Sequence, residues 1–128
     1  MSWLSWLLVI KIVITTISVA VPFMLFPPTW LKQKTGISAD SLLIRLYGVA
    51  ITALLVGYGF GIPTANSGQF PRGVVYMGLV SNIGAALLLL QSSKTRITFL
   101  LGIFFAVIAT GLIVFLIKPD LALSISIK

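Results

Sequence analysis

The chain has 128 residues, of which 59% are hydrophobic and only 9% are charged, and it contains no histidine, cysteine or glutamate. Soluble domains carry about 25% charged residues, so this composition excludes an ordinary soluble domain and indicates a membrane protein. The net charge of +7 arises from nine basic residues against two acids, Asp40 and Asp120. Because the basic residues are scattered singly near the ends of the apolar stretches, we expect them to meet lipid headgroups and expect no nucleic-acid partner.

The side chains that perform most catalytic and metal chemistry are missing from this sequence. Acid–base catalysis, nucleophilic catalysis and metal binding depend largely on histidine, cysteine and interior carboxylates. Both aspartates lie at the edges of the apolar stretches. A proton-driven carrier usually needs a buried acid, and the sequence places none inside these stretches. The sequence therefore predicts a protein that is not an enzyme and that holds neither a metal ion nor a cofactor.

Four apolar stretches of spanning length follow one another along the chain. The hydrocarbon core of a bilayer is about 30 Å thick, and a helix of about 20 residues crosses it. The stretches predict helices at 6–26, 41–62, 73–91 and 97–117. We expect an all-α fold, a single integral membrane four-helix bundle over residues 1–128, with up-down-up-down topology and both termini on one side. We expect it in the bacterial inner (cytoplasmic) membrane.

The first predicted span carries a lysine close to its start and a proline near its end. Lys11 is expected to extend back to the headgroups, and the alternative is that it faces a partner or an anionic ligand within the bundle. Pro22 lacks a backbone N–H and should kink the helix, which frees the carbonyl of Ser18. Pro27 and Pro28 end the span, and a polar connection at 32–36 follows.

The second predicted span begins with a capping residue and a basic residue. Ser38 or Asp40 is expected to cap the helix by accepting from its first amides. Arg45, which comes one turn later, is expected to reach a lipid phosphate or Asp40, with an anion site as the alternative. The span should end before a loop at 63–72, which is rich in turn-forming residues.

The string Val56-Gly57-Tyr58-Gly59 resembles the selectivity filter of potassium channels. In that family the string follows a threonine and a short pore helix, and its backbone carbonyls coordinate the ion. Here Leu55 takes the place of the threonine, and the preceding apolar segment is itself long enough to span. We therefore expect this string to be helical, with Tyr58 and Phe60 as interface aromatics near the helix end.

Small residues recur at helical spacing in the predicted spans. They let helix backbones approach closely, and this packing is the main source of helix association in lipid. The helix-packing candidates are Ala53, Gly57 and Gly61 in the second span, Gly78, Ser81 and Ala85 in the third, and Gly102 and Ala106 in the fourth.

The third span also carries Asn82 near its middle, and the fourth is followed by a short tail. An amide without a hydrogen-bond partner in an apolar interior costs several kcal/mol, so Asn82 is expected to contact a neighbouring helix or another subunit. The connection at 92–96 is short enough to make the third and fourth spans a helical hairpin. The tail after Pro119 alternates apolar and small residues with a strand-like period of two.

Two functions from different classes fit these features. The first is an accessory or structural subunit that packs against a larger membrane protein complex, with other membrane protein subunits and lipids as partners. The second is a small homo-oligomeric transporter or pore for an anionic or lipid-like substrate, which would use Lys11, Arg45 or Asn82. The two are distinguished by whether these side chains converge on an interior cavity or point to the headgroups.

Overall fold

The structure, a computed structural model, describes residues 2–37, 39–92 and 94–124. Within these ranges the chain is almost entirely helical and forms no β-strand, which confirms the expected all-α class. The helices in chain order are α1 (Trp3–Thr15), the π-helical turn η1 (Thr16–Ala20), α2 (Val21–Leu25), α3 (Pro28–Thr35), α4 (Ser41–Asn66), α5 (Arg72–Gln91), α6 (Arg96–Ile117) and α7 (Pro119–Leu123).

Four helical segments are long and apolar enough to cross a membrane. Their bounds are Trp3–Leu25, Ser41–Asn66, Arg72–Gln91 and Arg96–Ile117, and the first segment joins α1, η1 and α2. The largest departures from the predicted ranges are that α1 begins at Trp3 and that α4 continues past Pro63.

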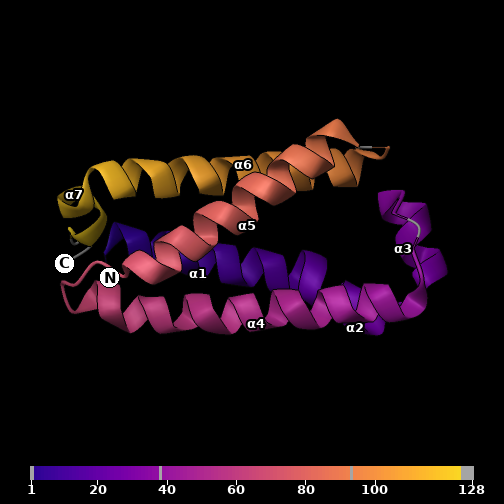
Figure 1. Ribbon diagram of the computed structural model, residues 1–128, viewed down its shortest axis with the longest axis horizontal. Coiled ribbons are helices and arrows are strands. Elements are labelled where there is room, and N and C mark those ends of the chain that lie inside the picture. The colour runs from indigo at the N-terminus through magenta and orange to yellow at the C-terminus, as the bar shows by residue number, and fades with distance from the viewer. Residues whose placement is uncertain (1, 38, 93, 125–128) are drawn as a thin grey trace.

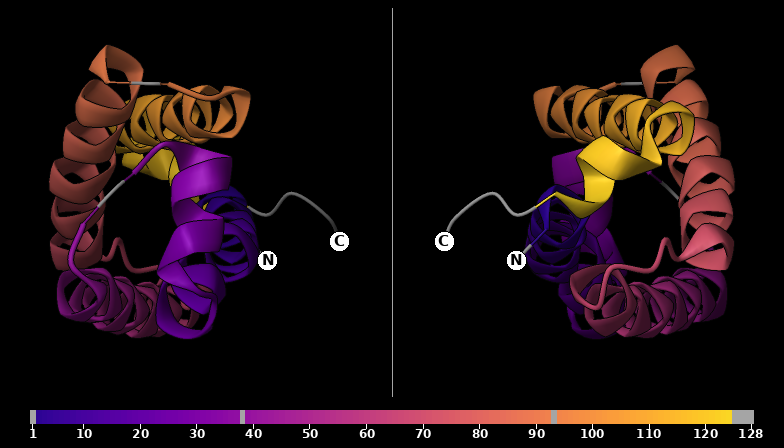
Figure 2. Two further views of the ribbon diagram at one scale, coloured as in Figure 1. Left: turned by 90° about the vertical axis from the view of Figure 1, so that its right-hand side faces the viewer. Right: turned by 90° about the vertical axis from the view of Figure 1, so that its left-hand side faces the viewer.

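The four long segments surround a common interior. α1 lies along α4, while α5 crosses from the end of α4 near its own start to α6 near its own end (Figure 1). The end-on views show α1, α4, α5 and α6 as the sides of a ring (Figure 2). The most extensive helix pair is α5 with α6, followed by α1 with α4. Sequence neighbours therefore do not all pack equally, and α4 and α5 diverge.

Where a kink was expected at Pro22, the chain forms the π-helical turn η1 just before the proline. The backbone N–H of Val21 donates to the carbonyl of Thr16, one residue further back than in an α-helix. Pro22 then falls in the first turn of α2, where a missing N–H disturbs the helix least. The helical structure therefore continues without a break from α1 through η1 into α2.

Polar side chains join α1 to the end of α4 near the N-terminus. The side-chain oxygen of Asn66 accepts from the backbone N–H of Ser2 at 3.3 Å and from the hydroxyl of Ser5 at 2.6 Å. We call Ser2, Ser5 and Asn66 the terminal clasp. Because the clasp holds the last turn of α4, that turn stays helical after Pro63, and the predicted loop is wrong over this turn.

The tail does not adopt the strand-like structure that its alternation predicted. Residues Pro119–Leu123 form α7, in which Ala122 is fully buried in the same apolar cluster as Leu4. The carbonyl of Ser124 accepts from the backbone N–H of Trp3 at 3.2 Å. Packing against α1 therefore decides the structure here, and the rest of the predicted pattern, at 125–127, lies outside the described residues.

The opposite end of the molecule is formed by α3 and the connection between α5 and α6 (Figure 1). The predicted polar connection at 32–36 is helical up to Thr35, and Gly36 ends α3 with a left-handed φ of 75°. The hydroxyl of Thr98 donates to the carbonyl of Thr35, which ties α3 to α6.

The cap of α4 follows one of the two alternatives that the sequence left open. The side chain of Asp40 accepts from the backbone N–H of Leu42 at 3.3 Å, so Asp40 is confirmed as a cap. The other candidate, Ser38, lies outside the described residues.

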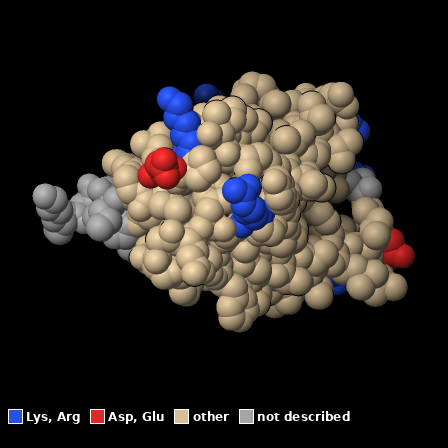
Figure 3. Space-filling view, turned by 60° about the vertical axis from the view of Figure 1, so that its left-hand side comes forward, with Lys and Arg blue, Asp and Glu red and all other residues tan. Residues whose placement is uncertain are grey.

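Large apolar side chains cover the outer faces of all four long segments. Ile17, Phe60, Val80 and Val107, one from each segment, are 62 to 77% exposed. In Figure 3 the charged residues are few and scattered over an otherwise uncharged surface. Soluble proteins rarely expose apolar surface on this scale, whereas lipid tails are as apolar as leucine and can cover it.

Candidate functional site

Lys11 lies inside the helix bundle and is only 5% exposed. Its Nζ atom is 4.0 Å from the ring centre of Phe105, 5.6 Å from that of Phe104 and 5.9 Å from that of Tyr58. These distances are within the range of cation–π contacts. Lys11 thus faces the interior rather than following the expected path to the headgroups, and its contact with a partner or an anionic ligand stays a prediction.

The helical position of Lys11 explains why it faces inward. Leu4, Leu8, Lys11 and Thr15 are all buried and recur at steps of three or four residues, so they share one face of α1. Since α1 begins at Trp3, Lys11 lies about 12 Å along the helix from its start. Both its direction and its depth keep the ammonium group away from the end of the helix.

Lys11 lines a cavity of about 320 Å³, which we call the lysine cavity. Its walls come from α1, α4, α5 and α6, and most of the lining side chains are apolar. The polar side chains among them are those of Lys11, Thr15, Tyr47, Tyr58 and Ser81.

A hydrogen-bonded group joins α4 to α5 beside this cavity. The hydroxyls of Tyr58 and Ser81 are 2.8 Å apart, and the amide nitrogen of Asn82 donates to the Tyr58 oxygen at 3.1 Å and to the Gly78 carbonyl at 2.7 Å. Asn82 thus finds the interhelical partner that its position requires. Tyr58 is 1% exposed, so the structure contradicts the expectation that it lies at the interface.

Two buried oxygens near these groups lack a partner among the described residues. They are the hydroxyl oxygen of Thr15 and the side-chain oxygen of Asn82. Thr15 lies one turn after Lys11 and also lines the lysine cavity. A polar atom left without a partner in an apolar interior is unfavourable, so both oxygens lower the stability of this arrangement.

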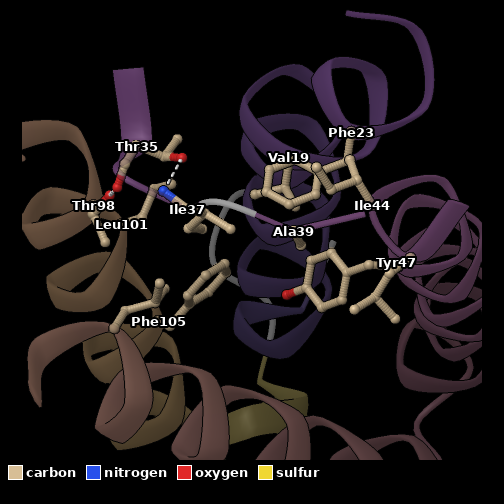
Figure 4. Close-up of a pocket in the computed structure, with 12 residues that line it drawn as sticks. Val19, Phe23, Thr35, Ile37, Ala39, Ile44, Tyr47, Thr98, Leu101 and Phe105 are labelled. Carbon is tan, nitrogen blue, oxygen red and sulfur yellow. Dashed lines mark hydrogen bonds between the residues drawn. The ribbon is translucent and has the colours of Figure 1, made fainter. Parts of the chain in front are cut away.

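A second cavity, of about 330 Å³, lies toward α3, and we call it the apolar cavity. Figure 4 shows its walls, which include Phe23, Ile37, Ile44 and Leu101. Its remaining lining residues are Val19, Thr35, Ala39, Leu43, Tyr47, Leu89, Thr98 and Phe105. Tyr47 and Phe105 line both cavities, which are therefore adjacent.

Arg45 makes a structural contact inside the chain. One of its guanidinium nitrogens donates to the carbonyl of Phe23 at 2.9 Å. In a regular helix that carbonyl would accept from residue 27, but Pro27 has no N–H to donate. Arg45 therefore completes the end of α2, where a positive charge also suits the helix dipole. It forms no ion pair with Asp40 among the described residues, and its contact with a lipid phosphate stays a prediction.

All four predicted packing glycines lie where helices approach closely. An added Cβ at Gly78 would lie 2.7 Å from Leu112, and one at Gly102 would lie 2.9 Å from Leu90. At Gly57 and Gly61 it would lie 3.1 Å and 3.0 Å from side chains of α5. Gly57 belongs to the string that resembles a potassium filter, and the whole string is helical within α4, as expected.

The other small residues predicted to pack are divided between the interior and the surface. Ser81 and Ala85 line the lysine cavity, and Ala106 packs against an apolar core cluster. Ala53 faces outward and is exposed. Ala53, the first of the predicted packing residues in α4, therefore does not pack inside the bundle.

The chain offers Lys11 no negative side chain. Asp40 and Asp120 are the only acids in the sequence, and both are exposed, one before α4 and the other in α7. Among the described residues no hydrogen-bond acceptor or acid pairs with the Lys11 ammonium. A lysine ammonium has three donors and no acceptor, so the arrangement is suited to binding a carboxylate, phosphate or similar anion.

The sequence patterns did not identify Tyr58, Thr15 and Phe105 as neighbours of Lys11. One available signal was the spacing of Leu4, Leu8, Lys11 and Thr15, which places the lysine on the same face as core leucines. No such signal marked Phe105. Because α6 is apolar on every side, tertiary packing decides which of its residues point to the interior.

Comparisons with protein-family models, with curated proteins and with solved structures find no match for this chain.

Proposed function

We propose that this chain is an integral membrane protein whose four long segments cross the bilayer up-down-up-down, with both ends on one side. The length and apolar character of the segments support insertion, as do the exposed apolar side chains on each of them. The terminal clasp and α7 support the topology, since they bring both ends of the chain and the end of α4 together. A bacterial inner membrane is part of this proposal.

The proposed function is to bind an anionic molecule at Lys11, within the helix bundle. One observation carries it: a buried ammonium lines a cavity, and neither of the chain's two acids lies in the interior. Of the three side chains that the transporter alternative would use, only Lys11 lines the lysine cavity, so they do not converge there and the proposal rests on Lys11. Such a site would serve a transporter of that molecule or a protein that holds it in the membrane.

The energetics of a buried charge support an anionic partner. Removing an ammonium from water without a counter-charge is costly, and contacts with aromatic rings offset only part of that cost. A carboxylate or phosphate beside Nζ would supply the missing charge.

Binding of hexadecyl phosphate to the purified protein tests this function. We expect Lys11→Met, which keeps the length of the side chain and removes its charge, to weaken binding about 10- to 100-fold, because hydrogen bonds to charged groups contribute about 1.5–3 kcal/mol. The matched control is Lys118→Met, since Lys118 is exposed. Equal affinity in the wild type and in both variants would refute the proposed site.

An accessory subunit is the second candidate function, and the outward position of Ala53 favours it. Small residues on an outer face allow another membrane helix to approach closely. Gentle solubilisation followed by identification of co-purifying proteins tests this candidate. The expected result is a stoichiometric partner that Ala53→Leu displaces, and a protein that runs alone would count against it.

A further inference from the structure

We propose that the anionic molecule is a single-chain acidic amphiphile, such as a fatty acid or a monoalkyl phosphate, whose hydrocarbon chain occupies the apolar cavity. The proposal rests on the proposed function, because it takes Lys11 as the site of the acidic headgroup. It adds where the rest of the molecule lies and how it enters.

The path into the bundle lies along the seam between α4 and α5. Near the loop that joins them, the two helices are held together by Gly61 against Val74 and by Tyr58 against Ser81. Further along, α5 leaves α4 and packs on α6, where Gly102 receives Leu90 (Figure 1). The seam therefore widens from the Tyr58 contact toward α3.

Both cavities lie along this widening seam. The lysine cavity is lined by Leu54 and Tyr58 of α4 and by Gly84 and Leu88 of α5. The apolar cavity continues it toward α3, between Leu43 of α4 and Leu89 of α5. Leu43 and Leu88 are 59% and 67% exposed, so side chains of the walls are also part of the outer face. A molecule in the surrounding lipid could enter sideways without passing through water.

The chemistry of the apolar cavity favours a hydrocarbon chain over a polar group. None of the described residues that line it is charged. Two of its hydroxyls are already engaged, because Thr35 donates to the Leu31 carbonyl at 2.6 Å and Thr98 donates to the Thr35 carbonyl. A polar ligand would therefore have few partners here, whereas an alkyl chain needs none.

The sizes and the order of the cavities favour one chain rather than two. Each cavity is near the lower end of the range of about 300–1,000 Å³ that is typical of ligand pockets. They are adjacent through Tyr47 and Phe105, with the ammonium in one and none in the other. A headgroup beside Lys11 thus places the chain past Tyr47 and Phe105, toward α3.

Photo-crosslinking with palmitate that carries a diazirine at the end of its chain tests the position of that chain. The protein in lipid nanodiscs is irradiated, and the labelled residues are identified by peptide mass spectrometry. We expect labels on Leu89 or Leu101, which line the apolar cavity. Labels confined to outward residues such as Val107 and Ile113 would overturn the proposal.

A paired substitution tests whether the seam is the entrance. Both Gly84 and Gly59 lie within helices, and an added Cβ would have no atom within 4 Å at either position, but only Gly84 lines the lysine cavity. We expect Gly84→Trp to reduce labelling of the cavity about tenfold or more and Gly59→Trp to leave it unchanged. Equal labelling in both variants would refute entry through the seam.

Three further ligands separate this inference from the proposed function. Lysophosphatidate and palmitate share a single chain but differ in their acid, hexadecanol keeps the chain without charge, and inorganic phosphate keeps the charge without a chain. We expect binding that depends on Lys11 for the first two only. If inorganic phosphate bound as tightly as palmitate, the amphiphile proposal would be refuted and the anion site at Lys11 would stand. If no ligand depended on Lys11 for binding, both proposals would be refuted.

Discussion

The two ends of the bundle differ in how their helices are joined. At the end with the termini, the clasp of Ser2, Ser5 and Asn66 and the packing of α7 hold α1, α4 and α6 together. Toward α3, α4 and α5 diverge, and two cavities occupy the space between helices. The comparison indicates that one end stabilises the fold while the other leaves room for a ligand.

The largest loss of stability is expected from a large side chain at Gly78, where α5 is in close contact with α4 and α6. Gly78→Leu would place side-chain atoms where Leu112 and the Tyr58 ring already lie, since an added Cβ alone would be 2.7 Å and 3.2 Å from them. Overpacking of this kind destabilises by about 1–3 kcal/mol. Thermal unfolding in detergent measures the effect.

The control is Gly59→Leu, at a helical position where an added Cβ meets nothing. It should leave the midpoint of unfolding nearly unchanged. If the two variants were equally stable, α4 and α5 would not be closely packed at Gly78, and the contrast between the two ends would be lost.

Removing the clasp should have the next largest effect. Asn66→Ala takes away the acceptor for both Ser2 and Ser5, and each such hydrogen bond contributes about 0.5–1.5 kcal/mol. Because the clasp also holds the turn after Pro63, amide hydrogen exchange at residues 64–66 should speed up. Ser67→Ala, which removes only a bond to Thr64, is the control and should leave exchange unchanged.

Arg45 provides a smaller test at the open end. Arg45→Met leaves the Phe23 carbonyl without its donor, and we expect a loss of about 1 kcal/mol because the contact is only partly buried. A double-mutant cycle with Asp40→Asn should show no coupling. Coupling between the two would instead support the ion pair that the sequence suggested.

The smallest effect is expected at Thr110. Its hydroxyl donates to the Ala106 carbonyl of its own helix at 2.9 Å, and the residue is exposed. Thr110→Ala should therefore change stability by less than about 0.5 kcal/mol. A clear loss of stability or a change of oligomeric state on native gels would reveal a partner helix on this face and would favour the accessory subunit.

The helices were predictable because their signals are local. Apolar runs of spanning length mark the four long segments, and the prolines at 27 and 28 mark the break before α3. Structure that depends on distant contacts was not predictable from those signals. Ala122 becomes helical by packing into the core, and the turn after Pro63 persists because Asn66 meets Ser2 and Ser5.

The candidate site shows the same division between local and distant information. The sequence marked Lys11 and Asn82 as polar groups within apolar spans, which is a local observation. It could not show which way Lys11 points, because a long side chain near a helix end can reach either headgroups or the interior. The aromatic surroundings of the ammonium come from α4 and α6, and only the assembled bundle brings them together.

The most direct test of the lysine site is a distance between nuclei measured by solid-state NMR. The protein is labelled with nitrogen-15 at the lysine side chains and reconstituted in bilayers with palmitate labelled with carbon-13 at its carboxyl group. We expect a nitrogen–carbon dipolar coupling strong enough for Lys11 Nζ to donate to a carboxylate oxygen at about 2.7–2.9 Å. This coupling should vanish in Lys11→Met. A carboxyl signal that persists in this variant, and is lost instead in variants of exposed lysines such as Lys32 and Lys118, would contradict the interior site.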